Sequence, residues 1–356
     1  TTEGDFLYNN PSISDGSISR IFHYGISGSS ATTASFGTYF GDGSHLTGLS
    51  GGGNVSNSGT PSVGQVAVWT DSETIQGTSN FIIDSNSRLS LSNNDDSDKT
   101  TLFGYEAGSL IASGDDENTM IGHQAGLRTT GGYNTYIGAN SGLGASGADS
   151  FNVGVGRNSL FAVTTAPQNV AVGNRSGLSL TTGGLNTFIG DNAGNATTAA
   201  TRTVIVGAFA ARANMTAAAE GSVGVGYEAL LSLTSGIGNV AVGSGSMAAN
   251  ATSDFNVAIG TNTLSKLTND GTTANTAVGY KALMVMTTGH SNTAVGYESL
   301  ENCVDGVNNT ALGYQSLTAD AGNNNTGIGL LALRATTGNQ HTAVGAYASH
   351  NIGAGA

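Results

Sequence analysis

The stretch Asn275-Thr-Ala-Val-Gly-Tyr280 recurs unchanged, seventeen residues later, as Asn292-Thr-Ala-Val-Gly-Tyr297. A close copy, Asn169-Val-Ala-Val-Gly173, shows that the phrase is Asn, a β-branched residue, a small residue, Val or Ile, and Gly. With the final glycine taken as position zero, fifteen copies follow one another at spacings of 16 to 19 residues. The glycines are Gly104, Gly122, Gly138, Gly156, Gly173, Gly190, Gly207, Gly226, Gly243, Gly260, Gly279, Gly296, Gly313, Gly329 and Gly345. An internal period of this kind is the mark of a repeat architecture.

The repeat positions have distinct chemistry. Position −1 is apolar in all fifteen copies and includes Val172, Val278 and Val295, while position −3 is always Thr or Val. Side chains of a strand alternate between its two faces, so positions −3 and −1 share one face and position −2 points the other way. We expect positions −3 and −1 to fill the inside of each coil, and position −2 to contact a neighbouring protomer. The candidates for that contact are Met120, Tyr136, Phe188, Ala277 and Ala294.

A period of seventeen residues with a glycine in every copy is too short for a helical hairpin. The sequence therefore predicts an all-β protein, a parallel β-solenoid of about fifteen coils with two short strands in each coil. Like residues then stack in register about 4.8 Å apart, which gives a rod of about 70 Å.

Composition excludes several classes of protein. The chain of 356 residues carries 11 basic and 24 acidic residues, so we expect no nucleic acid partner. No stretch is apolar enough for membrane insertion. Cys303 is the only cysteine and cannot form a disulfide within the chain.

The first hundred residues lie outside the repeat. We expect an N-terminal fibre or attachment segment at 1–50, a Gly/Ser-rich linker at 51–64 and a short β-strand shaft segment at 65–98. The repeat domain then covers residues 99–356.

A coil of this size holds about two or three apolar side chains, so its core is thin. Copies of the chain arranged side by side around an axis are the simplest way to cover a second apolar face. We therefore expect a parallel homotrimer.

The sequence predicts no catalytic, cofactor-binding or metal-binding residue. Short glycine patterns such as Gly224-Val-Gly226 arise from the repeat, and no helix is expected to follow them. The acidic group Asp115-Asp-Glu117 is interpreted as a surface turn, with a Ca²⁺ site as the alternative. Regular Thr pairs could bind ice on a flat face, but their variable spacing disfavours it.

The phrase Asn-Thr-Ala-Val-Gly-Tyr-x-Ala/Ser resembles the head repeats of trimeric autotransporter adhesins over residues 100–350. That resemblance implies a left-handed β-roll and three protomers side by side. The longer coils, the Thr-Thr-Gly turns and the phrase Gly41-Asp-Gly-Ser-His-Leu-Thr-Gly48 look like bacteriophage tail fibres. Asn169, Gly173, Asn275, Gly279, Asn292 and Gly296 carry the motif in three copies.

The leading hypothesis is a structural phage tail fibre in the virion, which spaces and presents host-receptor binding. Its N-terminal end would join other virion tail proteins, and a host surface glycan or protein is a further possible partner. A bacterial cell-surface adhesin head is the alternative. A glycan depolymerase is a third hypothesis, disfavoured because no acidic side chains stack at equal positions in adjacent coils.

Overall fold

The computed structural model describes residues 56–57, 65–69, 74–83, 89–91, 100–111, 117–144 and 150–350. These residues contain strands and turns but no helix. The expected segment 1–50 and all of the linker 51–64 except 56–57 lie outside them. The first strands are β1 (Ser56–Asn57), β2 (Gln65–Trp69), β3 (Thr74–Ile83) and β4 (Leu89–Leu91). β3 pairs antiparallel with both β2 and β4.

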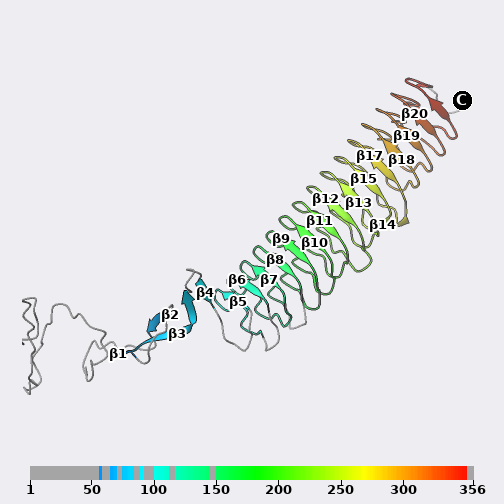
Figure 1. Cartoon of the computed structure of the whole chain (residues 1–356). Helices are drawn as coiled ribbons and strands as arrows, with labels where there is room; N and C mark the ends of the chain where they lie inside the picture. The colour runs from blue at the N-terminus through cyan, green and yellow to red at the C-terminus, as the bar shows by residue number, and fades with distance from the viewer. Residues whose placement is uncertain are drawn as a thin grey trace, which may run out of the picture. The chain divides into compact units, whose positions relative to one another are not determined.

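The repeats form a single parallel sheet of fifteen strands, one strand for each copy of the phrase (Figure 1). The strands are β5 (Thr101–Phe103), β6 (Thr119–Ile121), β7 (Thr135–Ile137), β8 (Val153–Val155), β9 (Val170–Val172), β10 (Thr187–Ile189), β11 (Val204–Val206), β12 (Val223–Val225), β13 (Val240–Val242), β15 (Val257–Ile259), β17 (Thr276–Val278), β18 (Thr293–Val295), β19 (Thr310–Leu312), β20 (Thr326–Ile328) and β21 (Thr342–Val344). Equal positions pair across neighbouring coils, as Ala277 does with Ala294. The predicted parallel β-solenoid is confirmed.

The expectation of two strands in every coil was wrong. A second strand pair occurs only once in the described coils, between β14 (Ser253–Asp254) and β16 (Gly271–Thr272). Elsewhere the return path of the coil turns sharply, because positions +2 and +4 have positive φ, as at Lys281 (φ 56°) and Leu283 (φ 53°). Backbone hydrogen bonds still join this path to the next coil, for example from Thr287 N to Val304 O at 2.8 Å.

The strands face the opposite way from the prediction. In fourteen of the fifteen strands of the long sheet the central residue, at position −2, is buried. The residues on either side of it, at positions −3 and −1, are never buried. Position −2 therefore lines the inside of the coil, and Val172, Val278 and Val295 point outward.

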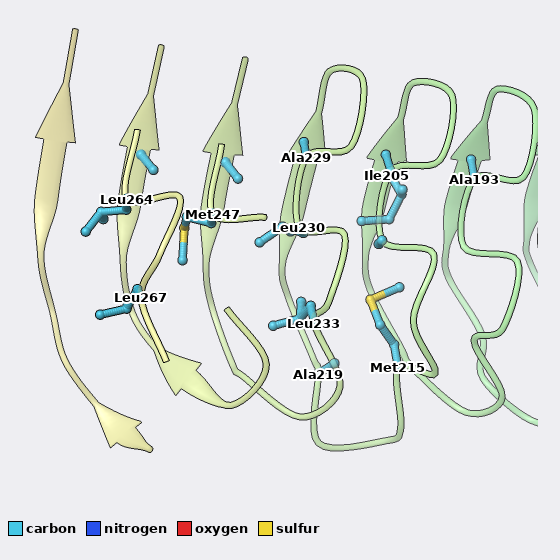
Figure 2. Packing of buried hydrophobic residues seen from close by; sticks show 14 of the residues in the cluster. Ala193, Ile205, Met215, Ala219, Ala229, Leu230, Leu233, Met247, Leu264 and Leu267 are labelled. Atoms are coloured by element: carbon cyan, nitrogen blue, oxygen red, sulfur yellow. The ribbon is translucent and has the colours of Figure 1, made fainter. Parts of the chain in front are cut away.

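The five residues predicted to contact a neighbouring protomer at position −2 were therefore also assigned wrongly. All five are fully buried within their own chain: Met120, Tyr136, Phe188, Ala277 and Ala294. The physical reason is that position +4 shares the interior with position −2. Figure 2 shows Leu230, Met247 and Leu264, all at position +4, stacked from coil to coil.

Positions −2 and +4 compensate each other in volume. Where position −2 is Leu, Met, Tyr or Phe, position +4 is glycine, and where it is Ile205, position +4 is Ala211. A Cβ added to Gly142 would come within 2.4 Å of the Tyr136 ring. In later coils position −2 is alanine and position +4 is leucine, as at Ala294 and Leu300. Most coils therefore fill a similar interior with different partners, as close packing requires. In the coil with Ala171 and Gly177 both positions are small, and Phe188 and Leu160 of the neighbouring coils lie against Gly177.

The asparagines at position −4 form a buried ladder along the stack. The side-chain oxygen of each accepts a hydrogen bond from the backbone N–H of the same position in the next coil, as from Asn292 N to Asn275 Oδ1 at 3.0 Å. The side-chain amide of Asn292 also donates to Gly306 O at 2.8 Å. In the described coils the ladder is interrupted once, between Thr203 and Ser222, whose side chains are shorter. Most buried amides at this position are thus satisfied by their neighbours, whereas the side-chain nitrogen of Asn152 is buried without a hydrogen-bond partner.

The glycine at position zero allows the close approach of successive coils. Gly279 has a φ of +132°, and a Cβ there would lie 2.3 Å from the carbonyl oxygen of Gly296. Only glycine fits a backbone of this conformation against a neighbour this near. The same holds for Gly173 and Gly296, which completes the structural role of the repeat residues.

Candidate interaction surface on the long sheet

The outward side chains at positions −3 and −1 of the fifteen strands form one continuous surface, here called the sheet face. Position −3 is Thr or Val, and position −1 is Phe, Ile, Val or Leu, so none of its thirty residues is charged. Leu312 is 47% exposed and Ile259 is 40% exposed. This surface is uncharged and rich in branched side chains, although the chain as a whole has a net charge of −13.

The dimensions of the sheet face follow from the coil geometry. Fourteen steps of about 4.8 Å make it about 67 Å long, and the three residues from position −3 to position −1 make it about 10 Å wide. Its area is therefore about 700 Å². The largest apolar patch on a typical monomer is about 300–600 Å², and larger ones mark interaction sites.

A row of side chains that includes five tyrosines borders the sheet face after the repeat glycine, at position +1. This row is called the trailing edge. Tyr280, Tyr297 and Tyr314 stack in it, with ring centroids 5.3 and 5.1 Å apart. These three rings are 41 to 47% exposed. Their spacing repeats the strand spacing, so the ladder follows directly from in-register coils.

A second row borders the sheet face on the other side, at position −5. This row is called the leading edge. Tyr133 and Phe151 stack in it with centroids 4.8 Å apart, and both are more than half exposed. Tyr133 has a φ of 64° and Phe151 a φ of 61°. Position −5 has a positive φ in every described coil, whatever its side chain, so this conformation belongs to the turn of the coil.

Charged groups lie beside the trailing edge rather than on the sheet face. Lys281 Nζ is 3.5 Å from Glu301 Oε1 and 4.0 Å from Glu298 Oε1, and Gln315 donates to Glu298 at 2.7 Å. The hydrogen bond with the Glu298 carboxylate raises the pKa of Tyr297, so its hydroxyl stays protonated at neutral pH. The tyrosine ladder is therefore bordered by a partly buried polar network.

The remaining predicted features carry no site in the described residues. No group of three or more His, Cys, Asp or Glu side chains that could hold a metal ion occurs there. Asp115 and Asp116, the core of the possible Ca²⁺ site, lie outside them. Cys303 is buried inside its coil, and burial raises the pKa of its thiol to about 12.

The edge rows and the outward direction of the valines were missed in the sequence. The signal that could have found them is the volume compensation between positions −2 and +4. Two positions that exchange Gly for Leu and Phe for Ala in step must share one interior. The face that does not take part, at positions −3 and −1, is then the outer one.

Within the described part of the chain, no helix is long and apolar enough to span a membrane. Comparison with protein-family models gave no match to the chain, and comparison with curated proteins gave none either.

Proposed function

We propose that the chain is a structural fibre protein that works as a parallel side-by-side homotrimer, most specifically a segment of a phage tail fibre. The observation that carries the proposal is the sheet face, uncharged over all fifteen strands and about 700 Å² in area. A stable interface between two proteins buries about 800 Å² on each partner. The sheet face supplies most of the area that such a contact between copies of the chain needs.

The parallel order of the coils suits this role. A parallel cyclic assembly has two different ends, so one end is available for the virion and the other for the host. The number of coils in such a stack also sets the distance between its two ends, since each coil contacts only its neighbours and each added coil lengthens the rod by about 4.8 Å.

Native mass spectrometry of the full chain tests the assembly. We expect a trimer, and negative-stain electron microscopy should show a rod of about 67 Å for the repeat domain. A folded monomer at micromolar concentration would overturn the homotrimer.

The place of the fibre needs its own experiment. Antibodies raised against the repeat domain should label virion tails in immunogold micrographs of a phage that encodes the chain. Labelling confined to the surface of bacterial cells would replace the tail fibre with the adhesin alternative, which uses the same trimer.

A further inference from the structure

Two Asp-Gly pairs lie in the described repeats, at Asp270–Gly271 and Asp305–Gly306. The carboxyl group of an aspartate can react with the backbone nitrogen of the residue that follows it, and glycine, which has no Cβ, hinders this attack least. Both pairs have the same covalent chemistry. Any difference in reactivity between them in the folded chain therefore comes from the structure around them.

The pair Asp270–Gly271 lies in an open loop. Its coil, from Gly260 to Gly279, is one of the two longest, with a spacing of nineteen residues. Both residues of the pair are exposed, and a Cβ added to Gly271 would meet nothing within 4 Å. The φ of Gly271 is +77°, a conformation that glycine adopts without strain. No packed neighbour therefore encloses the backbone at this glycine.

The pair Asp305–Gly306 is enclosed instead. Gly306 is buried, and a Cβ there would lie 2.5 Å from both the carbonyl oxygen of Ala321 and the Sγ of Cys303. The carbonyl oxygen of Gly306 accepts a hydrogen bond from the side-chain amide of Asn292 at 2.8 Å. Ring closure requires the backbone after the aspartate to rotate until its nitrogen approaches the carboxyl carbon. Here that rotation would first have to open the coil.

We propose that Asp270–Gly271 is a site of spontaneous isomerisation of aspartate to isoaspartate in the folded chain, and that Asp305–Gly306 is protected from it. The Gly271 nitrogen attacks the carboxyl carbon of Asp270: a C–N bond forms, the nitrogen loses its proton, and one carboxyl oxygen leaves as water. Water then opens the succinimide ring. Attack at the original main-chain carbonyl carbon gives isoaspartate, and attack at the other carbonyl restores aspartate. One water leaves and one enters, so the step needs no other reactant.

The modification would change the local structure of one coil. Isoaspartate adds a methylene group to the main chain just before Gly271, the first residue of β16, so the pairing of β16 with β14 would be lost. The hydrogen bond that the Thr252 hydroxyl donates to Asp270 Oδ1 would be lost as well. β14 and β16 form a sheet of their own, apart from the long sheet (Figure 1). The fibre would thus acquire a second form of this coil with age, while the sheet face stays as it was.

Peptide mapping of the full chain tests the site. One sample is incubated folded and one in denaturant, until the denatured chain carries isoaspartate at both pairs, which mass spectrometry and an isoaspartate-specific methyltransferase detect. In the folded chain we expect about tenfold or more isoaspartate at residue 270 than at residue 305, because opening of the coil limits the enclosed pair. In denaturant the two pairs should react at similar rates, since no structure then distinguishes them.

The variant Asp270→Glu is the matched control. It keeps the negative charge but cannot form the five-membered ring, so residue 270 should stay unmodified. Hydrogen exchange then reports the structural effect at Thr273, whose backbone N–H donates to Asp254 O at 3.3 Å. This amide should exchange faster in the incubated chain and stay unchanged in the incubated variant. Equal isoaspartate at both pairs in the folded chain, or none at residue 270, would overturn the proposal.

Discussion

Replacing Phe188 tests the shared interior of positions −2 and +4. Phe188 is fully buried, and a Cβ added to Gly194, at position +4 of the same coil, would lie 2.5 Å from its ring. Phe188→Ala should lower the free energy of unfolding of that part of the stack by about 3–5 kcal/mol, because it leaves a cavity in a close-packed coil.

A second substitution should recover part of that loss. Gly194→Leu recreates the Ala and Leu combination of the later coils, where Leu300 has a φ of 52°, close to the 58° of Gly194. Four added carbons at about 0.8 kcal/mol each return roughly 3 kcal/mol, and the left-handed backbone removes about 1. The double variant should therefore regain about 2 kcal/mol.

Hydrogen exchange is the suitable assay, because a long repeat array need not unfold in one step. Amides in the coil of Phe188 and its neighbours report the local free energy of opening. Gly194→Leu alone should be destabilising, since the phenylalanine still occupies the space. If the loss of unfolding free energy in the double variant equalled the sum of the losses in the two single variants, positions −2 and +4 would not compensate each other.

Three other predictions concern neighbouring positions. Ala277→Asp should destabilise its coil by several kcal/mol in denaturation, whereas Val278→Asp should leave the coil folded and dissociate the trimer in native mass spectrometry. Gly279→Ala should cost more than about 2 kcal/mol in the same denaturation series, because its Cβ meets a carbonyl; Gly221→Ala, with nothing within 4 Å, should cost less. Cys303 should resist iodoacetamide at pH 8 in the folded chain and react once denaturant opens the coil, as mass spectrometry would show.

The sequence predicted the location of every strand of the long sheet and their parallel stacking. This succeeded because a seventeen-residue period with a glycine in each copy leaves few architectures open. The prediction of which strand face is buried was wrong, because both faces are free of charge: position −1 is always apolar, and position −2 is apolar or glycine. Alternation alone cannot then say which face is the interior.

The buried asparagines at position −4 show why the polarity of a residue gave the wrong buried face. Asn275 and Ala277 lie on the same side of their strand, two residues apart, and both are fully buried. A polar residue at position −4 suggests a solvent-facing side, but the amide is satisfied by the next coil. Only repetition makes this possible, and a single coil viewed alone does not reveal it.

The interruption of the asparagine ladder has a mechanical consequence. Tension along the stack loads the contacts between coils in series, so the weakest contact yields first. Most steps of the ladder carry a hydrogen bond of about 3 Å from a backbone N–H to a side-chain oxygen, as from Asn186 to Asn169, but the step from Thr203 to Ser222 has none. A pulled rod should therefore part between β11 and β12, leaving two blocks of coils that each remain wound. Force on a fibre anchored at both ends would then separate the stack at one defined contact between coils.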